Sequence, residues 1–304
     1  MSVEGLKYYL GKRGGWFSFL SSRGLLNWMD DEPYLKLLFK YCMGYPLDLK
    51  NPKTYNEKLQ WLKLHDRNPL YTQLVDKLAV KDYIAEKLGP EYVVPVIGGP
   101  WDSADEIDFD ALPDQFVLKC THDSGGLVIC RDKAHFDREA AKAKLAKRLR
   151  RNFYWANREW PYKDVKPRVF AEKYLDGENA SLNDYKVMCF HGQAKLIQVH
   201  MGRFEHHTQD FYDTDWRLLD IYQDTPLSGI TLPKPPFFEE MCRLSERLSE
   251  GFLHLRVDWL YWQGQLYLGE LTFYDGSGLM AFDPKSYDEL LGSWLHLPTG
   301  REAT

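Results

Sequence analysis

The sequence predicts an α+β protein, in which antiparallel strand pairs are combined with helices that precede and separate them. Two pairs of aromatic and β-branched runs each surround a short turn that contains glycine, a pattern typical of antiparallel hairpins. These pairs are 184–190 with 195–201, and 254–261 with 265–273. At 304 residues, the chain is long enough to bury a large core and to divide into two or three lobes.

Composition narrows the class of protein. A hydrophobic fraction of 44% and an aromatic fraction of 15% indicate a well-packed globular chain. A formal net charge of −5 argues against nucleic-acid binding by the whole surface. The five cysteines show no metal-ligand spacing, so we expect free thiols in a reducing compartment. No run approaches the roughly 20 apolar residues of a membrane span, and no secretory signal is visible, so we expect a cytoplasmic protein.

Residues 1–30 interleave lysine and arginine with tyrosine, tryptophan and phenylalanine. This mixture predicts either an arm packed on its own domain or a segment that contacts an anionic membrane surface or a partner.

Helical signals follow this arm. We predict a short helix over 33–42, and a second helix that begins at Thr54, whose capping box is completed by Glu57. A third helix is predicted over 76–88, where Gly89-Pro90 ends it. Lys77 falls in its first turn, where the helix dipole disfavours a cation, so we predict that this lysine is held for an anion.

The next segment predicts a phosphate-binding hairpin. Strands are predicted over 92–97, 115–120 and 127–130. Lys119 lies at the end of one strand, and the small residues Ser124, Gly125 and Gly126 precede the next. Glycine lets backbone N–H groups approach phosphate oxygens, and the lysine supplies charge. The Walker order GxxxxGK[ST] is absent, and a plain glycine hairpin without function explains the loop as well.

Other elements complete the chain. They are a basic, solvated helix over 135–151, a strand over 168–175, a helix over 237–249 and a flexible loop over 275–278.

The C-terminal hairpin carries the strongest chemical signal. In simple register, Asp258 lies near Gly269, one residue from Glu270, so a small register shift or a bulge would bring the two carboxylates together. Both carboxylates stand among large apolar residues, where an unpaired charge is costly, and Arg256 shares the face of Asp258. We therefore predict a site for Mg²⁺ and phosphate, with solvent-facing carboxylates as the alternative.

Seven short segments, taken in order, are similar to motifs of the TupA-like ATP-grasp family of bacterial surface-polysaccharide biosynthesis. The resemblance covers about residues 40–298. The segments are Asn51-Pro52 through Lys58 with Trp61, Val75-Asp76-Lys77, Phe116 through Lys119, Ala171 through Leu175, Asp184-Tyr185-Lys186, Arg256-Val257-Asp258 and Gly269 through Phe273. The resemblance implies an ATP-grasp fold, with two α+β subdomains that clasp ATP and a mainly helical N-terminal region before them. Its expected divisions are an arm and helix over 1–50, a helical segment over 51–100, a small subdomain over 101–175 and a large subdomain over 176–304.

The resemblance also implies residue roles. The expected ATP contacts are Lys77 and Lys119 on the phosphates, Ser124, Gly125 and Gly126 in the closing loop, Glu172, Lys173 and Leu175 at the adenine, and Glu178 on the ribose. The expected Mg²⁺ ligands are Asp258, Glu270 and Thr272, the last standing where many ATP-grasp enzymes have asparagine. The expected catalytic residues are Arg256, Lys119 and Lys186, and Arg203 is a weaker candidate for contact with the acceptor.

The activity implied by the resemblance is that of an ADP-forming carboxylate–amine ligase that uses ATP and Mg²⁺. It would join an amino acid or another amine to a glycan or precursor that contains uronic acid. The implied partners are a nucleotide and a small-molecule or glycan substrate, with no nucleic acid, and a membrane or biosynthetic-complex contact through residues 1–30. A glycosyltransferase, for which Asp213-Thr214-Asp215 has the DxD form, and a phosphotransferase on the same fold remain alternatives.

Overall fold

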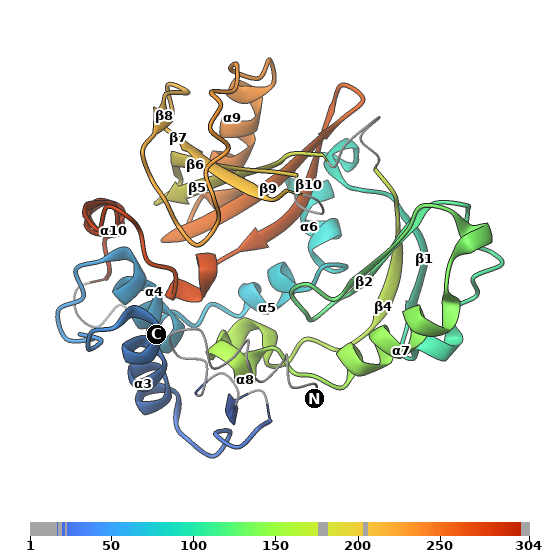
Figure 1. Cartoon of the computed structure of the whole chain (residues 1–304), viewed down its shortest axis with the longest axis horizontal. Coiled ribbons are helices and arrows are strands. Elements are labelled where there is room, and N and C mark those ends of the chain that lie inside the picture. The colour runs from blue at the N-terminus through green and yellow to red at the C-terminus, as the bar shows by residue number, and fades with distance from the viewer. Residues whose placement is uncertain (1–16, 18–19, 22, 176–181, 203–205, 299–304) are drawn as a thin grey trace.

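The computed structural model describes residues 17, 20–21, 23–175, 182–202 and 206–298. Two antiparallel sheets stand apart in the molecule, and α5 and α6 lie between them in Figure 1. One sheet has four strands in the order β1-β4-β2-β3, and the other has six in the order β10-β9-β5-β6-β7-β8. The α+β prediction is confirmed.

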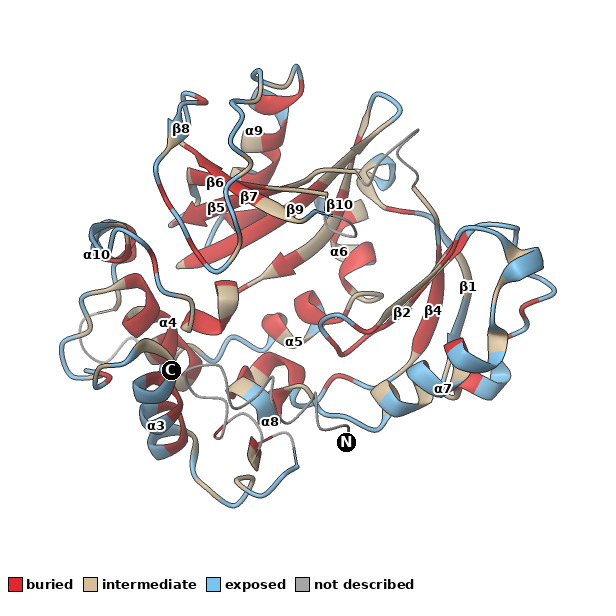
Figure 2. Ribbon diagram, in the orientation of Figure 1, coloured by how far each residue is buried: buried red, intermediate tan, exposed pale blue. Residues whose placement is uncertain are grey.

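The four-stranded sheet consists of β1 (Val96–Trp101), β2 (Phe116–Cys120), β3 (Leu127–Cys130) and β4 (Val169–Lys173). Helix α7 (Arg138–Leu149) covers one face, where Ala141 and Leu145 pack with Phe116 and Leu118 in a separate core. The rest of α7 is largely exposed, as Figure 2 shows, which agrees with the solvated face expected of this basic helix.

The six-stranded sheet consists of β5 (Asp184–Phe190), β6 (Gln193–Met201), β7 (Thr208–Tyr212), β8 (Leu218–Leu219), β9 (His254–Trp262) and β10 (Gln265–Thr272). Helix α9 (Phe238–Ser249) packs on it through apolar residues at helical spacing, among them Met241 and Leu248. The fully buried Trp259 donates its indole N–H to Ser245 of α9 at 2.8 Å.

Further helices in the described ranges are α3 (Asp31–Met43), α4 (Tyr55–His65), α5 (Leu70–Val75), α6 (Val80–Lys87), α8 (Tyr154–Asn157) and α10 (Ser286–Trp294). Short 3₁₀ turns occur at Pro90–Tyr92, Ala104–Glu106, Lys133–His135, Trp160–Tyr162 and Asp275–Gly278. The predicted capping box is confirmed at the start of α4, where the Thr54 hydroxyl accepts the Glu57 N–H and the Glu57 carboxylate accepts the Thr54 N–H.

The C-terminal hairpin contains the bulge that its sequence suggested. Leu268 pairs with Trp259, but Glu270 pairs with Asp258, so Gly269 is an extra residue in β10. On the other side of β9, Lys186 of β5 also pairs with Asp258. The bulge therefore places three charged side chains on adjacent strands.

Two predicted element boundaries were wrong. The strand predicted over 92–97 begins only at Val96, because Pro90 starts a 3₁₀ turn instead. The helix predicted from residue 76 begins at Val80, because the Asp76 carboxylate accepts the N–H groups of Leu78 and Ala79 and forms a turn. Lys77 thus lies before the helix, and its N–H donates to Thr121 O at 3.0 Å.

The loop over 275–278 is not a free loop but the buried 3₁₀ turn Asp275–Gly278. The Gln60 amide donates to the carbonyls of Ser277 (2.9 Å) and Gly278 (2.7 Å). Gly278 has a φ of +61°, and a Cβ there would lie 2.5 Å from the Gln60 amide nitrogen. This turn is therefore fixed against α4.

The described part of the N-terminal arm packs on α3. Phe17 contacts the ring of Tyr34 with 4.9 Å between centroids, and Ser21 Oγ lies 2.6 Å from the Tyr34 hydroxyl. All five cysteines are free thiols, as expected. No helix in the described ranges has the length and apolar character needed to cross a bilayer.

Candidate active site

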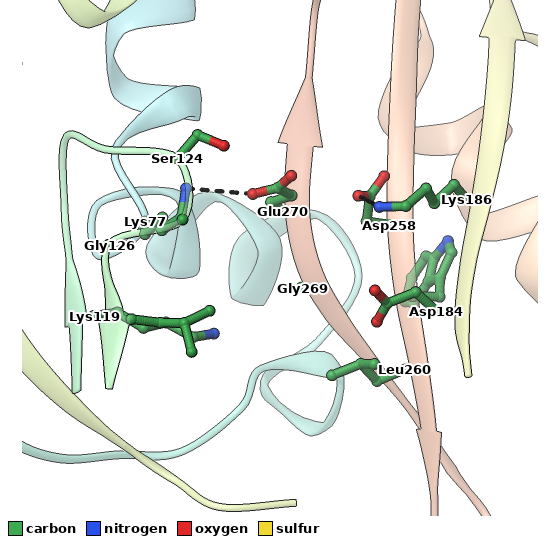
Figure 3. A pocket seen from close by; sticks show the side chains of 13 residues that line it. Lys77, Lys119, Ser124, Gly126, Asp184, Lys186, Asp258, Leu260, Gly269 and Glu270 are labelled. Carbon is green, nitrogen blue, oxygen red and sulfur yellow. Dashed lines mark hydrogen bonds and ion pairs between the residues drawn. The ribbon is translucent and has the colours of Figure 1, made fainter. Parts of the chain in front are cut away.

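The candidate site lies between the two sheets, in a cavity of about 140 Å³. The four-stranded side contributes Lys119 and the loop residues Ser124, Gly125 and Gly126, and Lys77 joins them from the turn before α6. The six-stranded side contributes Lys186, Asp258 and Glu270, as Figure 3 shows. The predicted phosphate-binding residues and the predicted Mg²⁺-binding residues, which are distant in sequence, therefore line one cavity.

Arg256 organises the carboxylates of the six-stranded side. Its guanidinium donates to both oxygens of Asp258 at 2.7 Å, to Glu270 at 3.3 Å and to the Thr272 hydroxyl at 3.1 Å. It also donates to Asp275. Burial disfavours the charge on Arg256, but Asp258 and Asp275 outweigh that effect and raise its pKa. The planar fork of arginine suits this arrangement, because it can bind several carboxylate oxygens at fixed angles.

Two lysines complete the charge balance. Lys186 pairs with Asp258, and Lys77 Nζ lies 3.3 Å from Glu270 Oε2. Burial alone would raise the pKa of Glu270, but Lys77, Lys186 and Arg256 together lower it. Glu270 is therefore ionised at neutral pH, and the ion pair with Lys77 joins the turn before α6 to β10.

Lys119 is held in position by a buried carboxylate. Glu172 of β4 lies 2.5 Å from Lys119 Nζ and 2.6 Å from Lys81 Nζ, and only Lys119 opens into the cavity. Burial would raise the pKa of Glu172, but Lys119 and Lys81 lower it. Sequence reasoning missed Lys81, because nothing local distinguishes it from a solvated helical lysine.

A second, mainly apolar space of about 160 Å³ continues the cleft and shares Lys119, Leu127, Asp184 and Leu260 with the first. Its apolar walls come from Val94, Val117, Ile129, Leu175 and Leu182. Lys173 and Tyr174 line one edge, where backbone groups follow β4. The cleft thus has an apolar slot at one end and a cluster of cations at the other, a shape suited to a flat ring attached to phosphates.

Glu172, Lys173 and Leu175, which the resemblance places at the adenine, all line this slot, and their role there stays a prediction. The Glu172 side chain is bound by the two lysines. Glu178 and Arg203 lie outside the described residues.

A third, polar cavity of about 320 Å³ is lined by Arg256 and shares Ser124, Lys186 and Glu270 with the first. Its walls carry carboxylates, amides and hydroxyls from distant segments, namely Asn157, Glu159, Gln198, Gln209, Gln223, Asp275 and Ser277. Sequence reasoning missed these residues. The alternation of Gln198 and His200 with apolar residues in β6 is what a solvent-facing strand would show.

The donor set at the bulge fits Mg²⁺ in a particular way. Asp258 and Glu270 are hard oxygen ligands on paired positions, and Thr272 adds a hydroxyl beside them. In the part of the chain that the structure describes, no group of three or more His, Cys, Asp or Glu side chains could hold a metal ion. Two carboxylates fit an ion that completes its shell with phosphate oxygens and water, rather than an all-protein cage.

Comparison with known proteins identifies the family of the chain. The model of the TupA-like ATP-grasp family matches residues 57–296. An L-amino acid ligase structure from Bacillus licheniformis is 13% identical with a TM-score of 0.49, and the match covers 89% of this chain and 64% of that one. The D-alanine–D-alanine ligase from Bacillus anthracis complexed with ATP is 16% identical with a TM-score of 0.39, covering 66% and 54%.

The chain therefore spans between about half and two thirds of the length of these ligases. No curated protein matches it. The family match covers most of the chain, including every strand of the two sheets described above. The chain belongs to the TupA-like ATP-grasp family, and it has the ATP-grasp fold.

Proposed function

We propose that this protein is an ADP-forming carboxylate–amine ligase that uses ATP and Mg²⁺. The observation that carries the proposal is the single cleft in which an apolar slot leads to Lys77, Lys119 and the Asp258–Glu270 pair, and then to a polar cavity. A nucleotide fits the first two parts, and a polar acceptor fits the third.

Each residue of the site has a distinct proposed role. Lys77 and Lys119 neutralise the phosphates, and Ser124, Gly125 and Gly126 offer backbone N–H groups to their oxygens. Asp258, Glu270 and Thr272 would hold Mg²⁺, which supplies charge neutralisation for the transferred phosphoryl group when bound. Lys186 lines both the nucleotide cavity and the polar cavity, and Arg256 lines the polar cavity, so both would act on the transferred phosphoryl group.

This set of residues suits phosphoryl transfer. The reaction requires alignment of the reactants and stabilisation of the charge on the phosphoryl group rather than a protein nucleophile. A substrate carboxylate attacks the γ-phosphate of ATP, so an acyl phosphate forms and ADP leaves. An amine then displaces phosphate and forms the amide. Closure of the loop over 121–126 would keep water from the acyl phosphate.

The substrates of the proposed reaction are an amino acid or another amine and a uronic-acid-containing polysaccharide or its precursor. The family resemblance favours this choice, together with a place in surface-polysaccharide biosynthesis and a location in the cytoplasm at the inner membrane face. The DxD-like Asp213 and Asp215 do not favour a glycosyltransferase, because both carboxylates pair with Arg217 in the turn after β7.

The proposed function predicts ADP release that depends on both substrates. Purified protein with Mg·ATP is incubated with uronic acids, including D-glucuronate, and with each proteinogenic amino acid, and ADP, phosphate and amide are measured. We expect amide and ADP in equal amounts from at least one pair. A stable phosphoester on a hydroxyl would instead indicate a phosphotransferase, and transfer from a UDP-sugar a glycosyltransferase.

A further inference from the structure

The polar cavity is lined by a carboxylate, Glu159, that has no role in the proposed mechanism and no recorded cation partner among the described residues. Asp258, Glu270 and Asp275 are each paired with cations, as described above. Glu159 also lines this cavity, and it is buried with 5% of its surface exposed. The structure records no ion pair between Glu159 and a cation of the described chain; its recorded partner is the hydroxyl of Ser277, which donates to Oε1. A carboxylate can accept about four hydrogen bonds, so Glu159 retains capacity for a ligand.

The neighbours of Glu159 hold it firmly. The fully buried Arg158 donates to the carbonyls of Leu26 (3.0 Å) and Met29 (3.1 Å) and stacks 4.1 Å above the Tyr34 ring. On the other side, the Trp160 indole donates to Asp66 O at 2.9 Å. Glu159 is therefore presented to the cavity from an anchored segment, as a residue that must act at a fixed position requires.

The Ser277 hydroxyl is itself oriented. Asn157 Nδ2 donates to Ser277 Oγ at 2.9 Å, which directs the hydroxyl proton towards Glu159. Beneath them, the fully buried Lys63 donates to the backbone carbonyls of Asn157 (3.0 Å) and Ser277 (2.8 Å) rather than to the carboxylate. Burial raises the pKa of Glu159, and the charge of Lys63 opposes that increase without forming a pair.

We propose that Glu159 binds the ammonium group of the incoming amine and accepts the proton that this nitrogen must lose before it attacks. The inference rests on the proposed ligase function. It follows from the position of Glu159 on the cavity that adjoins Arg256 and Glu270, where the acyl phosphate would form. A general base must reach the nucleophile directly, and a carboxylate without a cation partner suits a cationic group.

The step balances as follows. Glu159 takes one of the three N–H protons of the ammonium ion and becomes neutral, so the nitrogen lone pair is free. The C–N bond forms at the acyl carbon, and the bond from that carbon to the phosphate oxygen breaks. The electron pair leaves with phosphate, which takes the second N–H proton as hydrogen phosphate. Glu159 then returns its proton to solvent.

Hydroxylamine separates this role from the earlier phosphoryl step. It is unprotonated at neutral pH, so it traps an acyl phosphate as a hydroxamate without help from a base. Wild type, Glu159→Gln and Glu159→Asp are each supplied with Mg·ATP and D-glucuronate or another reactive uronic acid. Hydroxamate is then measured with hydroxylamine, and amide with the amino acid that serves wild type best. Glu289→Gln, on the exposed face of α10, removes the same charge elsewhere and serves as the control.

We expect Glu159→Gln to keep hydroxamate formation within about twofold and to lose at least about 100-fold in amide formation, the scale of general-base catalysis. Glu159→Asp should retain more amide formation than Glu159→Gln, and Glu289→Gln should match wild type. Amide formation within tenfold of wild type in Glu159→Gln, or a parallel loss of both products, would overturn the inference. If wild type gave neither product with any pair, the proposed function itself would fail, and the inference with it.

Discussion

Replacement of Arg256 by alanine is expected to lower the free energy of unfolding by about 3–5 kcal/mol, the usual cost of removing one partner from a buried ion pair. Only 10% of the Arg256 side chain is exposed, and it is bonded to three carboxylates, those of Asp258, Glu270 and Asp275. Without the guanidinium, these negative charges would repel one another within a partly buried site. Urea denaturation of wild type and variant measures the difference.

Arg217→Ala is the matched control. Arg217 also contacts two carboxylates, Asp213 and Asp215, but 75% of its side chain is exposed. Exposed ion pairs contribute about 0–1 kcal/mol, so this variant should stay within about 1 kcal/mol of wild type. If Arg256→Ala were as stable as Arg217→Ala, Arg256 would not be the residue that holds the acidic groups together.

The Asp258→Asn variant is expected to lose about 10²–10³-fold in the rate of ADP formation, the scale reported for removal of one electrostatic group from a preorganised site. The amide keeps the size of the carboxylate but removes the charge that pairs with Lys186 and Arg256. It also removes one of the two anionic ligands proposed for Mg²⁺, so half-saturation should require more Mg²⁺.

Initial rates of ADP release at several Mg²⁺ concentrations measure both effects. Asp215→Asn removes a carboxylate from the surface turn after β7 and should leave the rate unchanged. A rate for Asp258→Asn within threefold of wild type at every Mg²⁺ concentration would contradict the role given to the bulge.

The sequence predicted the C-terminal hairpin well because its signals are local. The strand alternation predicted that Arg256 and Asp258 share a face. The predicted register placed Asp258 one residue from Glu270, and the structure closes that gap with a bulge at Gly269. Lys119 was identified for a similar reason, since a strand end followed by a glycine loop is a local pattern. The α4 capping box and the strands of both hairpins were also confirmed on local grounds.

The residues that were missed depend on tertiary contacts. Lys81 forms an ion pair with Glu172, which is distant in sequence. Glu159 accepts a hydrogen bond from Ser277, which follows it by more than 100 residues. The sequence pattern of Gln198 is that of a solvent-facing strand residue. In the structure, its amide donates a hydrogen bond to Asp275, in the turn Asp275–Gly278, at 3.1 Å. The position of Lys77 was misjudged because the Asx turn at Asp76 competes with helix initiation.

The central claim is that Lys77 and Lys119, from one side of the cleft, and Arg256, Asp258 and Glu270, from the other, form a single nucleotide site. Calorimetric titration of the protein with Mg²⁺ and the non-hydrolysable ATP analogue AMP-PNP tests it most directly. We expect one binding site in wild type, an affinity at least about tenfold weaker in Lys119→Ala, and no change in Lys147→Ala on the exposed face of α7. Equal affinity in wild type and Lys119→Ala, or no binding by wild type, would contradict the account.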